Sequence, residues 1–366
     1  MKRHPLLRAA VSIAAVLFVL AALAALSFAK SFWGCAADRR IMYGNLKLLD
    51  QEHRSIYSSG GVTIHIDRIL SGRLMAIIPE GGPNLLWENK NPETTLWGWK
   101  NYGGEKTWIG PQKAWTNLLA SGSDWPPPPQ FDGDPYEYVN PGARGDMELL
   151  SAAVPQWNLR VRRRIGVGSD HIVRVWSRLE KADETAPMPD IRFQNWSVAQ
   201  FAPASKIYAR LCGKGRISGE PQTGWNPPTP LPEPEALADG ILRFDLSQTA
   251  TGKTGCKGYL DADALALEVA GGVLIISHIL PPGADPEPDY NHPPERAQIF
   301  LSARQGMPEG CEPYMELEWA QPWPQSEHTV EYRFIPAKPG KTAEEMILHE
   351  FHVSKLLALV LSCSRN

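Results

Sequence analysis

The sequence lacks the features of a nucleic-acid-binding or metal-binding protein. It has 37 Lys and Arg against 40 Asp and Glu, a formal net charge of −3, which argues against a basic nucleic-acid-binding surface. Only five cysteines occur, and none forms a C-x-x-C pair or has metal-like spacing to a histidine. We therefore expect no metal ion and no cofactor.

Helical periodicity is also scarce in this chain. The 31 Gly and 33 Pro make up about 17% of the 366 residues, compared with roughly 12% in average proteins. Such a composition disfavours a helix-dominated fold, because both residues interrupt helices. The 43% hydrophobic and 21% charged residues still exclude wholesale disorder.

The N-terminus has the pattern of an export signal. Lys2, Arg3 and Arg8 precede an uncharged apolar run over residues 9–29, which ends in small residues. Residues 1–29 are therefore predicted to be a secretory signal peptide, although the run is long enough to serve as an uncleaved signal anchor. A third interpretation takes Gly34-Cys35 as the end of a lipobox, with Cys35 lipidated. All three place the body in the periplasm or cell envelope, with possible membrane attachment through the N-terminus.

The body of the chain is predicted to be all-β. Period-two alternation indicates antiparallel strands with one covered face, and it is clearest in a hairpin of residues 157–166 and 171–180, where Arg160, Arg162 and Arg164 face opposite to the apolar residues. Further strands are expected at 62–70, 73–79, 194–200, 206–211, 241–246, 265–270, 273–279, 296–302, 314–319 and 328–335. This pattern favours a large sandwich or barrel over a βαβ fold.

Long connections rich in proline and glycine join these strands. Residues 80–140 include Pro126–Pro129 and show no sustained periodicity, and 226–234 and 281–294 are also rich in proline. Loops of this length often bind ligands. We divide the chain into the signal segment, a linker with the approach to the first strand (30–60), a β domain (61–336) and a C-terminal helical tail (337–366). The helix of this tail begins at a capping box formed by Thr342 and Glu345.

One loop has the composition of a sugar-binding wall. Carbohydrate sites combine aromatic platforms with planar amides and carboxylates. The loop supplies Trp97, Trp99, Asn101, Tyr102, Glu105, Lys106, Trp108, Gln112, Trp115, Trp125 and Asp132. The alternative is that these tryptophans pack an irregular loop onto the sheet, as buried aromatic residues usually do.

A second candidate feature is a pair of carboxylates near the C-terminus. On a strand over 314–319, Glu316 and Glu318 share one face, opposite Met315, Leu317 and Trp319. Two carboxylates on one face can bind hydroxyls or act as a general base. The alternative is a solvated outer face. His278, within an apolar run, is expected to be a satisfied core histidine.

Several short segments together resemble a known superfamily. They are GRL (72–74), NLLW (84–87), NYGGEKTW (101–108), PQ (111–112), WPPP (125–128), NWSV (195–198) and YMELE (314–318). Over roughly residues 60–336 the chain resembles an uncharacterised bacterial family within the galactose-mutarotase-like superfamily. The NYGGEKTW segment is the most specific of the matches.

The resemblance implies a β-supersandwich with a carbohydrate cleft on a concave sheet face. Aldose 1-epimerases of this superfamily use a glutamate to remove the anomeric hydroxyl proton, which matches Glu316 first and Glu318 next. The epimerase acid is a histidine, but the corresponding segment here, 192–200, contains none, and Trp196 takes its approximate place. Trp196 and Gln200 of that segment are candidate ligand-binding residues.

Three functions follow as hypotheses. The first is an exported carbohydrate-binding protein, the second an aldose epimerase with Glu316 as general base, and the third a non-catalytic envelope protein with a structural or partner-binding role.

Overall fold

The computed structural model describes residues 21–22, 54–89, 100–141, 146–213, 215–218, 229–238, 240–247, 255–282, 295–302 and 312–363, with the backbone alone at 140–141 and 354–363. Apart from residues 21–22, the expected signal segment, Cys35, Trp97 and Trp99 lie outside these ranges. Cys212 and Cys256 carry free thiols. No helix in the described part of the chain is long and apolar enough to span a bilayer.

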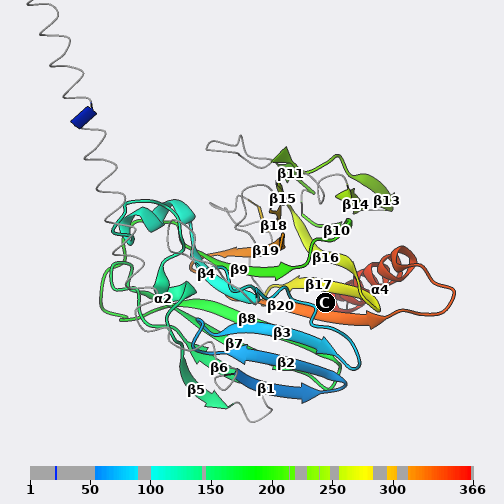
Figure 1. Cartoon of the computed structure of the whole chain (residues 1–366), viewed down its shortest axis with the longest axis horizontal. Helices are drawn as coiled ribbons and strands as arrows, with labels where there is room; N and C mark the ends of the chain where they lie inside the picture. The colour runs from blue at the N-terminus through cyan, green and yellow to red at the C-terminus, as the bar shows by residue number, and fades with distance from the viewer. Residues whose placement is uncertain are drawn as a thin grey trace, which may run out of the picture.

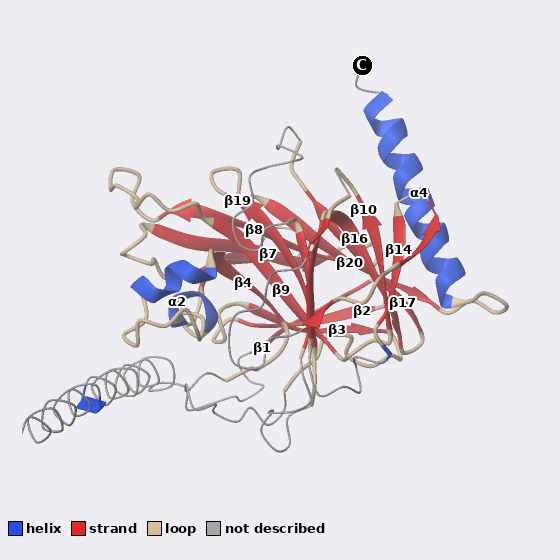
Figure 2. Cartoon of the chain, turned by 90° about the horizontal axis from the view of Figure 1, so that it is seen from above, coloured by secondary structure: helices blue, strands red, loops and turns tan. Residues whose placement is uncertain are grey.

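Two ten-stranded sheets face each other and form a β-sandwich (Figures 1 and 2). The first sheet has the order β1 (Arg54–Ser59), β2 (Val62–Asp67), β3 (Arg73–Pro79), β4 (Glu105–Gly110), β9 (Gln194–Phe201), β19 (Met315–Pro322), β18 (Ala297–Leu301), β15 (Cys256–Leu260) and β11 (Ile217–Ser218). In addition, β12 (Thr229–Pro230) pairs in parallel with β15.

The second sheet is antiparallel throughout. Its order is β13 (Glu235–Ala238), β14 (Ile241–Asp245), β10 (Lys206–Leu211), β16 (Ala262–Val269), β17 (Gly272–Ile279), β20 (His328–Pro336), β8 (Ile172–Lys181), β7 (Leu159–Val167), β6 (Met147–Leu150) and β5 (Glu137–Pro141). The expected hairpin is formed by β7 and β8. The prediction of an all-β sandwich is therefore confirmed.

The segment 80–140 is less irregular than its sequence suggests. It contains β4, the 3₁₀ helix η2 (Gln112–Asn117), the short helix α2 (Pro129–Asp132) and the start of β5. All six residues of β4 are buried, so both of its faces are covered and no alternation of apolar and polar residues is required. The expectation of a structureless connection was wrong here for that reason.

The interior between the sheets contains polar pairs as well as apolar side chains. Glu105 on β4 forms an ion pair with Arg163 on β7, and both side chains are fully buried. The Ser197 hydroxyl lies 3.0 Å from His328 Nε2. These contacts join strands of opposite sheets, so they fix which face of each strand is internal.

His278 also lies in this interior. It stacks on Trp319 with ring centroids 5.2 Å apart, and among the described residues neither ring nitrogen has a hydrogen-bond partner. The residue is thus a core histidine, but its polar atoms are not satisfied as expected.

Helices lie at the ends of the sandwich. Figure 2 shows α2 and α4 (Ala343–Cys363) at opposite ends. At the start of α4 the Thr342 N–H donates to Glu345, and the Glu345 N–H donates to the Thr342 hydroxyl. Met346, Ile347 and Phe351 of α4 pack against buried residues of the second sheet.

Candidate functional site

The candidate site lies on the face of the first sheet that points away from the second sheet. Side chains alternate along a strand, so the inward positions of Glu105, Ser197 and Trp319 place their neighbours on the outer face. That face brings together five residues, which we call the carboxylate cluster: Lys106 (β4), Gln200 (β9), Gln298 (β18), Glu316 and Glu318 (β19). Figure 1 shows these strands side by side.

Glu316 occupies the most accessible position of the cluster. It stands opposite Gln200 in the β9–β19 register, and Gln200 Nε2 donates to Glu316 Oε1 at 2.6 Å. Lys106 Nζ lies 3.9 Å from the same oxygen. Glu316 is 8% exposed, whereas Lys106 and Gln200 are fully buried.

Glu318 lies deeper and accepts two hydrogen bonds. Trp196 Nε1 donates to Glu318 Oε2 at 2.6 Å, and Gln298 Nε2 donates to the other carboxylate oxygen. The two glutamates thus share a face, as the alternation of 314–319 predicts. They lie in a buried environment rather than on a solvated surface.

Burial shifts the pKa values in this cluster in the direction that favours the uncharged form of each side chain. It raises the pKa of Glu318 to about 8, with a further contribution from the charge of Glu316. Burial also raises the pKa of Glu316, while Lys106 opposes that shift. The pKa of Lys106 falls to about 8, chiefly through burial and secondarily through the nearby charge of Arg73. The cluster therefore contains groups that exchange protons near neutral pH.

Several polar atoms of the cluster are left without a hydrogen-bond partner. Among the described residues this holds for Lys106 Nζ, Gln200 Oε1 and Gln298 Oε1. The ammonium lies over the Trp108 ring, 4.8 Å from its centroid. A buried donor without an acceptor costs free energy, and a ligand hydroxyl, which both donates and accepts, would satisfy an ammonium and an amide oxygen together.

Four tryptophans form a wall beside the cluster. Trp108 meets Trp196 edge to face at 5.2 Å and Trp125 at 6.2 Å, and Trp115 stacks on Trp196 at 6.0 Å. Trp108, Trp115 and Trp196 are buried, and Trp125 is partly buried. The wall therefore packs mainly on itself, and Trp125 is its least buried member.

Asp132 links the tryptophan wall to β3. Its carboxylate accepts from Trp108 Nε1 at 2.7 Å and from the Arg73 guanidinium at 2.7 Å. Arg73 also lies over the ring of Tyr102, 6.0 Å from its centroid. Burial raises the pKa of Tyr102 to about 12, so this phenol stays protonated. Asp132, Arg73 and Tyr102 thus support the tryptophan wall from one side.

Three of the predicted ligand-binding residues are not brought to the cluster. Glu105 points between the sheets, where its ion pair with Arg163 holds it. The Asn101 side chain accepts from the Gly103 N–H at 3.3 Å and shapes the turn before β4. Gln112 is half-buried at the start of η2, and within the described ranges it has no hydrogen bond or ion pair to the cluster.

Sequence reasoning missed Gln298 and Arg73. Gln298 faces Glu318 in the β18–β19 register. Its position within the expected strand at 296–302 was a weak indication of a buried polar contact, since a polar residue within an apolar strand requires a partner. Arg73 begins an expected strand, but its contact with Asp132 spans 59 residues of sequence. No local sequence pattern predicts a contact between residues so far apart in the chain.

No group of three or more His, Cys, Asp or Glu side chains suited to a metal ion occurs among the described residues.

No family model matches the chain, and no curated protein matches it. Solved structures that are similar to the chain include two that differ widely in kind. A TPR-domain-containing protein from Parabacteroides distasonis matches at a TM-score of 0.46 and 12% identity, over 80% of this chain and 48% of that one. A 4-alpha-glucanotransferase from Thermococcus litoralis matches at 0.37 and 13%, over 77% of this chain and 37% of that one. The chain thus spans less than half of either protein, and neither likeness is close enough to assign a fold family.

Proposed function

We propose that this chain is an exported carbohydrate-binding protein with a galactose-mutarotase-like supersandwich fold. The sugar binds over the carboxylate cluster and beside the tryptophan wall. The observation that supports this most directly is Lys106, a fully buried ammonium with no hydrogen-bond partner among the described residues. It lies between a carboxylate and an aromatic ring, which is the combination of groups that recognises sugar hydroxyls and C–H faces.

The affinity should be modest. A few aromatic contacts and hydrogen bonds at about 1 kcal/mol each, less the cost of association, give about −4 to −8 kcal/mol, or millimolar to micromolar dissociation constants.

Isothermal titration of the purified protein with a panel of aldoses and oligosaccharides tests the proposal. Lys106→Met and Trp125→Ala should each weaken binding about tenfold, because each removes one contact of roughly 1–2 kcal/mol. Lys113→Met, at an exposed lysine of η2, is the matched control and should leave binding unchanged. Absence of binding across the panel, or equal binding by all three variants, would overturn the proposal.

A second candidate function is an aldose epimerase. The observation in its favour is the 3.9 Å separation between Lys106 Nζ and Glu316 Oε1, which places an acid next to the proposed base although the expected histidine is absent. Glu316 would take the proton of the anomeric hydroxyl while Lys106 gives a proton to the ring oxygen. The C–O ring bond breaks and the aldehyde forms, and reversal on the other face yields the other anomer.

Anomer exchange followed by NMR tests this second function. Glu316→Gln should abolish the acceleration while sugar binding persists within a few fold. Unchanged exchange rates with wild-type protein, across aldoses that it binds, would leave a binding protein without epimerase activity.

Export remains part of the proposal. Fractionation of cells that produce the full chain should place it in the envelope, and Cys35→Ser should release it from the membrane only if Cys35 is lipidated. Recovery of the chain in the cytoplasm would contradict export.

A further inference from the structure

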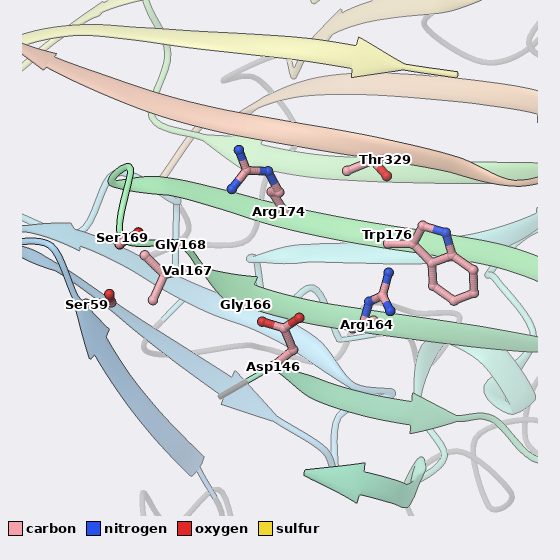
Figure 3. A pocket seen from close by; sticks show the side chains of 10 residues that line it. All are labelled: Ser59, Asp146, Arg164, Gly166, Val167, Gly168, Ser169, Arg174, Trp176 and Thr329. Atoms are coloured by element: carbon pink, nitrogen blue, oxygen red, sulfur yellow. The ribbon is translucent and has the colours of Figure 1, made fainter. Parts of the chain in front are cut away.

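A separate pocket lies on the opposite side of the sandwich from the carboxylate cluster. It is about 480 Å³ in volume and opens on the outer face of the second sheet, where Ser59, Asp146, Arg164, Ser169, Trp176 and Thr329 contribute to its walls (Figure 3). Ligand pockets usually have volumes of about 300–1,000 Å³. The size therefore suits a monosaccharide or a small disaccharide.

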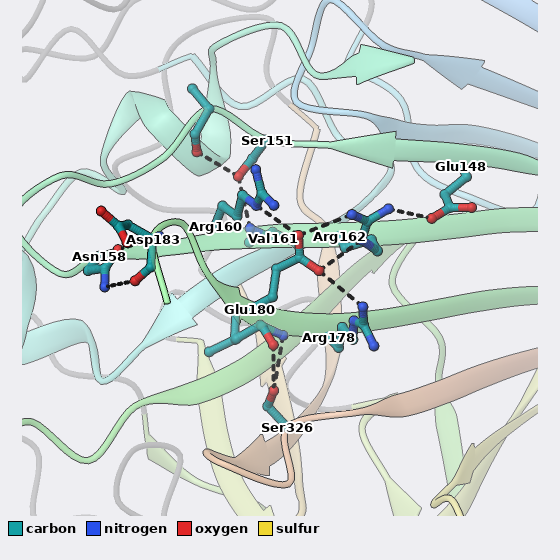
Figure 4. A network of polar contacts seen from close by, with 12 residues as sticks. Glu148, Ser151, Asn158, Arg160, Val161, Arg162, Arg178, Glu180, Asp183 and Ser326 are labelled. Carbon is teal, nitrogen blue, oxygen red and sulfur yellow. Dashed lines mark hydrogen bonds and ion pairs between the residues drawn. The ribbon is translucent and has the colours of Figure 1, made fainter. Parts of the chain in front are cut away.

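Arg164 differs from the other arginines on this face. Arg160, Arg162 and Arg178 all donate to the Glu180 carboxylate (Figure 4). In the described part of the chain, Arg164 has no hydrogen bond or ion pair. Its guanidinium therefore retains its full capacity to bind an anionic group.

An aromatic contact holds this guanidinium in place. Arg164 stands opposite Trp176 in the β7–β8 register, and its guanidinium carbon lies 5.2 Å from the centroid of the indole. Stacking on an aromatic face leaves the in-plane N–H groups of arginine available. The planar donor fork is thus oriented before a ligand arrives, and bidentate binding of a carboxylate is its characteristic use.

A carboxylate on the same pocket wall, that of Asp146, also forms no ion pair with the residues that the structure describes. Asp146 lies directly against Gly166, where a Cβ would fall 2.1 Å from Asp146 Oδ1. Glycine at 166 therefore creates the space that this side chain occupies. Among the described residues Asp146 forms no ion pair, so the pocket presents one free cation and one free anion that do not pair with each other.

The other arginine of the pocket is already neutralised. Arg174 pairs with Asp170 at 2.6 Å and with Glu331 at 2.8 Å. Together with Asp146, these carboxylates disfavour a dianion such as a phosphate ester. The pocket therefore fits a ligand with a single negative charge and several hydroxyls.

We propose that this pocket binds an acidic monosaccharide of the hexuronate class. The ligand carboxylate binds the Arg164 guanidinium, and its hydroxyls donate to Asp146 and exchange hydrogen bonds with Ser59, Ser169 and Thr329. The three hydroxyl side chains favour a polyhydroxylated ligand over a free amino acid, which has a carboxylate and an ammonium but few hydroxyls. This site is independent of the carboxylate cluster.

Titration of the purified protein with sodium glucuronate, followed by calorimetry, tests the inference. Wild-type protein should bind glucuronate, and Arg164→Gln should weaken binding about tenfold or more, as expected for loss of a charge-assisted pair. Asp146→Asn should weaken it by a smaller factor. Arg160→Gln is the matched control on the same strand, outside the pocket, and should change binding less than twofold.

Competing ligands separate the remaining possibilities. Sodium acetate or free glycine that competes as well as glucuronate would overturn the assignment to a sugar acid, as would glucose that displaces bound glucuronate as well as free glucuronate does. Equal glucuronate binding by wild type and Arg164→Gln would overturn the site itself. None of these outcomes bears on sugar binding at the carboxylate cluster, which is measured with neutral aldoses.

Discussion

The native chain should become less stable as the pH rises from 5 to 8, and replacing Glu318 with glutamine should remove most of this pH dependence. Burial and the charge of Glu316 raise the pKa of Glu318 from its usual 4.5 to about 8. In this window the folded chain holds a proton that the unfolded chain releases. The stabilising effect of that proton is complete below about pH 4.5, and it is lost as the pH rises to about 8.

The magnitude follows from the two pKa values. One pKa unit corresponds to about 1.4 kcal/mol, so Glu318 alone should lower the free energy of unfolding by about 4 kcal/mol as the pH rises from 4.5 to 8. Lys106 acts in the opposite sense at higher pH. Its folded pKa of about 8 lies below the usual 10.5, so stability rises again across that interval, and the native chain should be least stable near pH 8.

Urea unfolding followed by tryptophan fluorescence at pH 5, 6, 7 and 8 measures this effect. Glu318→Gln keeps the shape of the side chain and cannot ionise, so its stability should vary much less with pH than that of the native chain. Glu331→Gln, on the outer face of the second sheet, is the control and should follow the native curve. Parallel curves for Glu318→Gln and the native chain would refute the reasoning that burial keeps Glu318 protonated.

Three further changes probe the fold. Arg163→Met should destabilise the chain by about 3–5 kcal/mol, because it leaves Glu105 unpaired between the sheets. In a double-mutant cycle, combining it with Glu105→Leu should recover most of that loss of stability. Additive losses in the two single variants would contradict the pairing. Gly103→Ala should lower the free energy of unfolding by at least about 2 kcal/mol, since φ is +84° and the new Cβ would lie 2.2 Å from the Trp87 carbonyl oxygen. An unchanged free energy of unfolding in chemical denaturation would show that the substitution causes no strain. Thr342→Ala should remove about 1 kcal/mol through loss of the helix cap; an unchanged midpoint of unfolding would show that the cap adds nothing.

Alternation along strands predicted much of the sandwich. The β7–β8 hairpin and the shared face of Glu316 and Glu318 both follow from the two-residue repeat, because one face of each strand is apolar. Arg163 lies in phase with Leu159, Val161 and Ile165, and a buried arginine at such a position demands a buried anion.

The details of the candidate site were less accessible. Glu105 and Lys106 are adjacent in sequence, so they must point to opposite faces of β4, but nothing local decides which of them faces the ligand side. That choice depends on Arg163, which comes 58 residues later. Likewise, Asp132 joins the site only because α2 returns the chain to Trp108 and Arg73. Contacts of this length depend on topology rather than on local pattern.

All eight residues of β9 are buried, and this strand lies in the interior of a ten-stranded sheet with Gln200 on one face and Ser197 on the other. Such strands open to solvent only in near-global unfolding, so their amide hydrogens exchange most slowly. The floor of the candidate site is therefore as resistant to fluctuation as the core itself. Differences in ligand preference among chains of this architecture should accordingly arise from the connections around the floor, because a substitution on β9 disturbs the ligand face and the inter-sheet core at once.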